Sequence, residues 1–380
     1  MWGVVGDFPP TLPEEEEKDF DMRSEALYFC IISGERHMTS IKAIAKIAGV
    51  STATVSRVLN NHPYVSEPTR KKVKDVIFAL DYYPNALARG LKTRSSRTIG
   101  LLLPEIQNMF IPAVTFGLEE VLKENGYSVL LAYTFYDDEE ECRSILAFAQ
   151  RKIDALVHIG TREHTEKKTD FMTNVLGDIP LFFVNDLIPE ENAYCIYNDE
   201  EEGAYLATKH LIDQGHTRIA FINGNPLYTS YFNKRKGFLR ALDEAGLDFD
   251  PSLYADYPMN LQDVYQPAEA YELAKKIASS KPLPTAYFAA SDLLAIGLIR
   301  YLHERKIPIP DGCSVVGFDN IPIAQHIHPP LTTVDQKPRE LGRFTGNLIV
   351  KIMKEGPLPE KCYSFIPALI IRESSGRQGV

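Results

Sequence analysis

The chain has 380 residues, too many for one ordinary hydrophobic core, so two or three domains are expected. Its 44% hydrophobic residues and formal net charge of −10 are typical of a soluble globular protein, and no apolar run approaches the roughly twenty residues that a membrane span needs. The five cysteines are scattered and have no paired metal-ligand spacing. We expect them to be free thiols in a reducing cytoplasm.

Residues 1–37 differ in composition from the rest of the chain. They contain three prolines, the acidic run Glu14 to Glu17 and the only tryptophan, Trp2. The short apolar patch Leu27 to Ile32 has no basic flank before it and no small-residue cleavage site after it, so a secretion signal is not expected. We expect a disordered acidic extension or a start codon assigned too early. The alternative is a regulatory tail that competes with DNA for the basic segment after it.

The stretch Ile41 to Asn60 predicts a helix, a tight turn and a second helix. Apolar residues recur at helical spacing in its first half, at Ile41, Ile44, Ala45 and Ala48. Gly49 tolerates a positive φ and can turn the chain. Ser51 can then cap the second helix, because its hydroxyl accepts a hydrogen bond from a backbone N–H two or three residues on.

The second helix, Thr52 to Asn60, has an inward and an outward face. The inward stripe consists of Val55, Val58 and Leu59. The outward residues, which are candidates to reach base edges, are Thr52, Ala53, Ser56 and Arg57.

Charge favours DNA binding over a generic helical hairpin. Residues 38–97 hold eleven basic residues against three acidic ones, a net charge of +8 within a chain of −10. A basic island on an acidic protein is the electrostatic footprint of phosphate binding.

Beyond the Ser95-Ser96 linker, buried strands and amphipathic helices alternate, which predicts parallel, doubly wound sheets, enough for two subdomains. Such sheets bind ligands at the carboxyl ends of their strands. The expected strands are Thr98 to Leu103, Tyr127 to Tyr133, Ala155 to Ile159, Leu181 to Val184, Ile219 to Ile222 and Ser364 to Ile371. The expected helices are Pro112 to Asn125, Glu139 to Arg151, Glu201 to Gln214, Lys234 to Ala245, Leu293 to His303 and Arg339 to Lys354.

No residue pattern indicates catalysis, a metal or a cofactor. The nine histidines lack ligand spacing, and His326 and His328 would splay to opposite sides of an extended segment. Gly224 and Asn225 follow a strand but lack the lysine and hydroxyl residue of a phosphate-binding loop. We therefore expect no enzyme. The alternative class is a sugar-binding or sugar-processing protein without a regulatory role.

Three segments resemble the lactose-repressor (LacI/GalR) family of bacterial transcription regulators. They are AGVSTATVSRVLNN (Ala48 to Asn61), VSEPTRKKV (Val65 to Val73) and YYPNALARGLKT (Tyr82 to Thr93). Further on, VVGFDNIPIAQHIHPPLTTVDQ (Val315 to Gln336) resembles the family's final crossover. The resemblance implies an α/β fold with an N-terminal helix-turn-helix headpiece and a two-subdomain core like that of periplasmic binding proteins.

By this resemblance the expected domains are a helix-turn-helix domain at 38–83, a hinge helix and linker at 84–97, and a ligand-binding and dimerisation core at 98–380. Thr52, Ala53 and Arg57 would read the major groove, and Leu91 of the hinge helix would wedge into the central base step, where unstacking permits a bent duplex. The residues expected to contact DNA are Ser51, Thr52, Ala53, Thr54, Ser56, Arg57, Asn60, Tyr64, Asn85, Ala88, Leu91 and Lys92.

The resemblance also implies a ligand cleft between the subdomains. The expected contacts are Asn108, Phe110, Asn185, Lys234, Arg235, Asp292 and Phe318. Asp292 could hold ligand hydroxyls or could cap the helix after it. Two residues depart from the family pattern: Lys234 stands where arginine is common and cannot make its two-pronged contact, and Asn185 stands where aspartate is frequent.

No leucine-heptad tail follows the last strand, so a homodimer on a near-palindromic double-stranded operator is expected. The predicted function is a repressor whose operator affinity is controlled by a small molecule, a sugar or sugar derivative. DNA and ligand affinities are then coupled reciprocally. Whether the ligand is an inducer or a corepressor, and which operator and genes are involved, stay open.

Overall fold

The computed structural model describes residues 40–59, 62–80, 82, 95–107, 109–160, 166–188, 192–256, 267–278 and 282–377, with only the backbone for 166–170. The chain divides into two compact units, residues 1–89 and 90–380, which are described separately.

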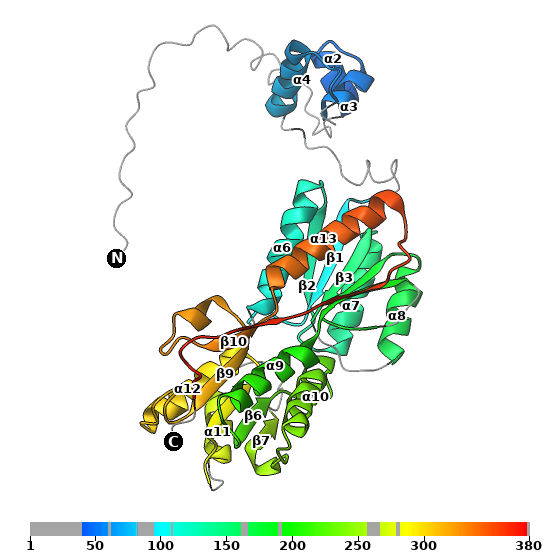
Figure 1. Ribbon diagram of the computed structural model, residues 1–380. Helices are drawn as coiled ribbons and strands as arrows, with labels where there is room; N and C mark the ends of the chain where they lie inside the picture. The colour runs from blue at the N-terminus through cyan, green and yellow to red at the C-terminus, as the bar shows by residue number, and fades with distance from the viewer. Residues whose placement is uncertain are drawn as a thin grey trace, which may run out of the picture. The chain divides into compact units, whose positions relative to one another are not determined.

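The first unit contains a three-helix headpiece, drawn in blue in Figure 1. Its helices are α2 (Ile41–Ile47), α3 (Thr52–Leu59) and α4 (Glu67–Ala79). They share a small core of Ile44, Ala45, Ala48, Val55, Val58, Val65, Val73 and Val76. The predicted inward stripe of α3 is thus confirmed, with Leu59 packed at the edge of this core.

The second unit begins with a six-stranded parallel sheet in the order β11-β5-β4-β3-β1-β2. Its strands are β1 (Thr98–Leu103), β2 (Ser128–Tyr133), β3 (Ala155–Ile159), β4 (Leu181–Val184), β5 (Ala193–Asn198) and β11 (Cys362–Phe365). The helices are α6 (Phe110–Glu124), α7 (Asp138–Gln150), α8 (Glu166–Leu176) and α13 (Pro338–Glu355). Separate clusters place α6 and α13 on one face and α7 and α8 on the other, so both faces are covered.

A second six-stranded sheet has the order β12-β10-β9-β8-β6-β7 and is parallel except for β12, which runs antiparallel to β10. Its strands are β6 (Ile219–Asn223), β7 (Tyr254–Asp256), β8 (Ala286–Ala289), β9 (Ser314–Asp319), β10 (Thr332–Asp335) and β12 (Ala368–Ile370). The α-helices are α9 (Glu200–Asp213), α10 (Thr229–Glu244), α11 (Pro267–Ile277) and α12 (Asp292–Glu304), with short 3₁₀ turns at Pro251–Leu253 and Pro322–Gln325. Two doubly wound subdomains are therefore present, as predicted.

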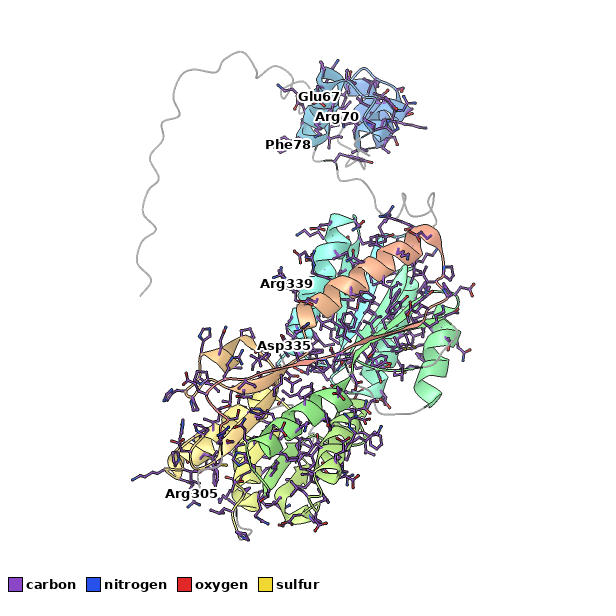
Figure 2. All side chains as sticks on the ribbon, in the orientation of Figure 1. Glu67, Arg70, Phe78, Arg305, Asp335 and Arg339 are labelled. Carbon is purple, nitrogen blue, oxygen red and sulfur yellow. The ribbon has the colours of Figure 1, made fainter. Side chains whose placement is uncertain are left out.

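The chain crosses between the two sheets three times, from β5 into α9, from β10 into α13, and from β11 into β12. The red segment of Figure 1 traces the last of these crossings. Asp335 and Arg339, labelled in Figure 2, bracket the second crossing. Each subdomain is consequently built from separated parts of the sequence.

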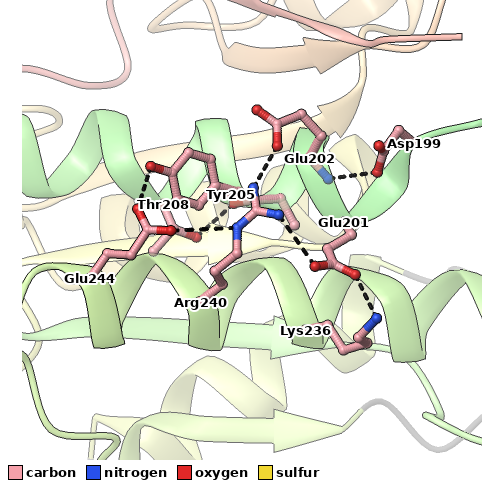
Figure 3. Close-up of polar contacts among 9 residues, drawn as sticks. Asp199, Glu201, Glu202, Tyr205, Thr208, Lys236, Arg240 and Glu244 are labelled. Carbon is pink, nitrogen blue, oxygen red and sulfur yellow. Dashed lines mark hydrogen bonds and ion pairs between the residues drawn. The ribbon is translucent and has the colours of Figure 1, made fainter.

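Two helix pairs, α6 with α13 and α9 with α10, pack at very short range because glycines lie where they meet. A Cβ on Gly342 would overlap the carbonyl of Val114, and one on Gly237 would overlap the carbonyl of Glu201. An ion-pair network also spans α9 and α10 (Figure 3). In it, Arg240 contacts Glu201 at 3.3 Å and Glu202 at 2.5 Å.

Several predicted element boundaries were wrong, and so was the capping role considered for Asp292. The last strand, expected at Ser364 to Ile371, is two strands in different sheets, because the chain leaves the first sheet at Ile366 and Pro367. Helix α10 begins at Thr229 rather than at Lys234. Asp292 does not cap α12: Ser291 does, since its hydroxyl accepts from the N–H of Leu294 at 3.2 Å.

Candidate functional site

Helix α3 presents a polar outer face in the headpiece. Thr52, Ala53 and Arg57 are exposed, and Thr54 and Ser56 are half-buried. The turn before α3 is formed as predicted: Gly49 has a φ of +61°, and the hydroxyl of Ser51 accepts from the N–H of Thr54 at 3.1 Å. A helix of this size fits the major groove, and short polar side chains preceding an arginine suit base edges.

Exposed cations lie on the other two helices of the headpiece. Lys42 and Lys46 on α2 and Lys71, Lys72 and Lys74 on α4 are exposed. Tyr64, another predicted contact, is 89% exposed.

Arg70, in contrast to these lysines, is engaged within the headpiece. Its side chain is only 13% exposed and pairs with Glu67 at 3.2 Å. Its guanidinium also donates to the carbonyl of His62 at 2.7 Å, so it holds the turn before α4. Figure 2 labels Arg70 and Glu67 on the headpiece. Arg70 is therefore a structural cation rather than a free phosphate contact.

Six predicted contacts lie outside the described residues and stay predictions. They are Asn60, Asn85, Ala88, Leu91 and Lys92 for DNA and Asn108 for the ligand. The predicted hinge helix lies outside them as well.

A small cavity lies between the two subdomains of the second unit, at the carboxyl ends of strands from both sheets. It measures about 30 Å³ and is lined by Phe110, Ile111, Tyr136, Gly160, Asn185, Glu200, Ser230, Lys234, Asp319 and Gln336. Its place matches the rule that ligands bind outside the carboxyl ends of parallel strands. The predicted residues Phe110, Asn185 and Lys234 meet here.

Glu200 is the centre of the polar network in the cavity wall. Its Oε1 accepts from Ser230 Oγ at 2.5 Å and from Asn185 Nδ2 at 3.2 Å, and it lies 3.5 Å from Lys234 Nζ. Lys234 also donates to the carbonyl of Ala290 at 3.2 Å and lies 4.2 Å from the centre of the Phe318 ring. With only 4% of Lys234 exposed, its charge is offset by protein groups.

Asp319 ends β9 and is buried in the same wall. Its pKa is raised to about 7, because burial, together with the nearby Glu200 and Glu105, outweighs the lowering by Lys234 and by the hydrogen bond from Gln336. Gln336 Nε2 donates to Asp319 Oδ1 at 2.7 Å.

Two amide oxygens in the wall lack a hydrogen-bond partner among the described residues: Asn185 Oδ1 and Gln336 Oε1. Asn185 is 8% exposed and Gln336 is 2% exposed. The amide nitrogen of Asn185 donates to Glu200, and that of Gln336 donates to Asp319. A buried acceptor without a donor costs about 1–3 kcal/mol, so both oxygens call for a donor from elsewhere.

Three other predicted ligand contacts do not line this cavity. Asp292 is fully buried, and its carboxylate accepts from Thr333 Oγ1 at 2.5 Å and from the N–H of Ile321 at 2.8 Å. Burial raises its pKa well above the usual range. Phe318 is fully buried beneath Lys234, and Arg235 stacks on Tyr254 at 5.3 Å.

Four residues that line the cavity were not among the predicted ligand contacts: Glu200, Ser230, Asp319 and Gln336. The positions of these residues at the ends of secondary-structure elements could have indicated them. Asn185, Asp319 and Gln336 each stand within one residue of the end of a buried strand, and Glu200 and Ser230 begin helices that open onto the cavity.

A larger hollow of about 880 Å³ lies at the opposite, amino-terminal edge of the first sheet, near Ser95 and Asp154. Its main carboxylate is already satisfied, since Asp154 accepts from Ser95 Oγ at 2.5 Å and from the N–H groups of Ser96 at 2.8 Å and Arg97 at 3.0 Å. The smaller cavity, with its unsatisfied acceptors, is therefore the better candidate for a ligand site. The hydrogen bonds to Asp154 beside the larger hollow instead hold the linker residues against the core.

Comparison with known proteins decides the family. Residues 40–85 match the model of bacterial regulatory proteins of the lacI family, and residues 208–375 match that of a periplasmic binding protein-like domain. The chain is 35% identical to the HTH-type transcriptional repressor PurR of Vibrio parahaemolyticus over 338 residues, 89% of this chain and 98% of that protein. It is 33% identical to PurR of Histophilus somni over 337 residues, with 89% and 99% covered. The chain belongs to the lacI family.

Solved structures agree with this assignment. The complex of the transcriptional regulator CelR with cellobiose is 27% identical, with a TM-score of 0.66 over 88% of this chain and 99% of that one. The lac repressor dimer bound to operator and the anti-inducer ONPF is 21% identical, with a TM-score of 0.77 over 89% and 99%, and supports the fold alone. This lacI-family protein is a DNA-binding transcriptional regulator of the repressor type and not an enzyme. Among the described residues no helix is long and apolar enough to cross a membrane.

Proposed function

We propose that this regulator acts as a homodimer that binds a near-palindromic operator through α3, and that an uncharged small molecule rich in hydrogen-bond donors, a neutral sugar, controls operator affinity from the cavity. The observation that carries the ligand class is the pair of unpartnered amide oxygens, Asn185 Oδ1 and Gln336 Oε1. A ligand that offers hydroxyl groups would satisfy both.

The charge of the wall disfavours anionic ligands. The single ammonium in the lining is that of Lys234, and it is already engaged by the carboxylate of Glu200 and by the carbonyl of Ala290. A phosphate group would enter a low-dielectric site in which the described lining offers no other cation, and that desolvation would be uncompensated.

The size of the cavity implies motion. About 30 Å³ is roughly a tenth of the smallest ordinary ligand site, about 300–1,000 Å³. Binding therefore requires the two subdomains to separate at the cavity and close again around the ligand. In a dimer that movement changes the geometry of the segments leading to DNA, which couples the two sites by a free energy of about 1–3 kcal/mol.

Relatives support the class. CelR is described in complex with cellobiose, a neutral sugar, whereas the similar repressors carry the name PurR. The first favours a neutral sugar here, and the test includes purines as a second class of uncharged ligand.

The test is a thermal-shift screen of the full chain against neutral sugars, the matching sugar phosphates and purines. A ligand at 100 times its Kd stabilises by about 2.7 kcal/mol. We expect a neutral sugar to raise Tm and its phosphate to leave Tm unchanged. The same sugar should then change operator affinity, measured by fluorescence anisotropy at fixed salt.

Variants localise the response. Gln336→Met removes the buried acceptor and should reduce the ligand-induced rise in Tm, whereas Gln325→Met, at an exposed position, should not. A response to phosphorylated sugars alone would contradict the ligand class. A ligand response that is the same in both variants would contradict the cavity as the site.

A further inference from the structure

Two cysteines far apart in the sequence face each other in the first sheet. Strands β5 and β11 are parallel, and their register sets Cys195 opposite Cys362. The pairing is tight at this point, since the N–H of Cys195 donates to the carbonyl of Lys361 at 2.7 Å. Opposed residues of neighbouring parallel strands point to the same face, and strands lie about 4.8 Å apart. That spacing falls within the Cα separation of about 4.4–6.8 Å that a disulfide spans.

The two thiols have different surroundings. Cys362 lies on the edge strand and is exposed, whereas Cys195 is 1% exposed. The Cys195 thiol donates to the carbonyl of Ile188 at 3.1 Å. The pKa of Cys195 is raised to about 12, chiefly by burial and in smaller part by the nearby Cys362 thiol, in keeping with thiols in contact. Cys362 is thus the solvent-exposed thiol, and Cys195 is a buried, neutral thiol opposite it on the neighbouring strand.

We propose that Cys195 and Cys362 form an oxidation site at which a hydroperoxide converts the two thiols into an intramolecular disulfide. The Cys362 sulfur attacks the peroxide oxygen, the O–O bond breaks, and a sulfenic acid and one water form with hydrogen peroxide as oxidant. The Cys195 sulfur then attacks the sulfenic sulfur, the S–O bond breaks, and a second water leaves. Two thiols and one hydrogen peroxide yield one disulfide and two waters.

The chemistry predicts a slow and reversible bond. The high pKa of Cys195 keeps its thiolate fraction small, so the second step limits the rate. Because Cβ atoms of opposed strand residues lie farther apart than in an unstrained disulfide, the bond should be readily reduced.

The cysteine pair lies close to two of the connections between the subdomains. Cys195 precedes the first crossing, at Asp199, by four residues, and Cys362 precedes the third crossing, at Pro367, by five. A disulfide would covalently link the two strands from which two of the three connections between the subdomains begin. This step rests on the proposed function: if ligand binding needs those connections to bend, oxidation should weaken the ligand response.

The test exposes the full chain to hydrogen peroxide, blocks remaining thiols with N-ethylmaleimide, and maps non-reduced tryptic peptides by mass spectrometry. We expect a cross-linked pair of peptides containing Cys195 and Cys362, lighter than the reduced pair by two hydrogens and separated by dithiothreitol. Cys362→Ser should abolish it, and Cys142→Ser, a half-buried cysteine on α7, should leave it intact.

Several results would overturn the proposal. They are alkylation of both thiols after oxidation, conversion of Cys362 to the sulfinic acid while Cys195 is still alkylated, or a link from Cys362 to another chain. Because Cys362→Ser changes an exposed side chain, circular dichroism should show it folded, which keeps the loss of the cross-link interpretable. An unchanged ligand-induced Tm rise in the cross-linked protein would refute the regulatory step alone, whereas absence of that rise in the reduced protein would refute the proposed function.

Discussion

Replacing the buried carboxyl of Asp319 by an amide should stabilise the protein, and more so at high pH. In the unfolded chain this group ionises near its ordinary value of 3.8, and in the fold near 7. Between those values the folded state holds more protons, so its stability falls as pH rises from about 4 to about 7 and then levels off. Asp319→Asn does not titrate and escapes this loss. The backbone should tolerate the change, because φ is +112° and asparagine accepts positive φ well.

The magnitude comes from the two pKa values. Their difference of roughly 3 corresponds to about 4 kcal/mol at about 1.36 kcal/mol per unit, with roughly 1.6 kcal/mol already lost at pH 5. The variant should therefore gain about 2–3 kcal/mol more over the native protein at pH 8.5 than at pH 5.0. Lost attraction to Lys234 lowers the absolute gain and makes these figures upper bounds.

Differential scanning fluorimetry at the two pH values measures this gain. At roughly 2–4 °C per kcal/mol, the Tm difference between variant and native protein should widen by roughly 4–12 °C. Asp311→Asn, at an exposed position, is the matched control. An identical Tm difference at pH 5.0 and pH 8.5 would show that Asp319 is not held in the protonated form in the fold, and the reasoning would fail.

Two further predictions concern the headpiece and the helix packing. Arg57→Ala should weaken binding to the specific operator more than it weakens binding to unrelated DNA, by about 1–3 kcal/mol or roughly 5–150-fold, and should leave the ligand-induced Tm rise unchanged. Anisotropy titrations on both DNAs at one salt concentration measure this, and equal losses of affinity on the two DNAs would contradict a base contact. Gly342→Ala should destabilise the second unit by about 1–3 kcal/mol in denaturant unfolding, because its Cβ would overlap the carbonyl of Val114; a variant of native stability would show that α6 and α13 can move apart without cost.

Local patterns predicted the headpiece and most helices and strands well, because the physics that shapes them is local. Gly49 needed positive φ and Ser51 offered a cap, and both are found in those roles. The last strand was predicted poorly because Ser364 to Ile371 reads as one apolar run. Its division between two sheets depends on partners more than 30 residues away, such as Thr333 opposite Ile370.

The lining of the cavity was predicted in part. Strand ends were visible in the sequence, so Asn185 and Phe110 could be placed. Asp292 was predicted as a ligand contact, whereas Asp319 lines the cavity instead. Which carboxylate is already occupied depends on Thr333 and Ile321, which bind Asp292 from 41 and 29 residues away along the chain. The pairing of Cys195 with Cys362 likewise depends on strand order rather than on sequence spacing.

The three crossings between the sheets also affect the order in which the headpiece and the two subdomains can fold during synthesis. The headpiece uses only neighbouring segments and can fold as soon as α4 has left the ribosome. The first sheet lacks its edge strand until Cys362–Phe365 is made, and the second lacks its own until Ala368–Ile370 is made. A nascent chain can therefore carry a folded DNA-binding module while both halves of its sensor are unfinished, and a product terminated before Cys362 would expose apolar sheet edges to proteases and chaperones.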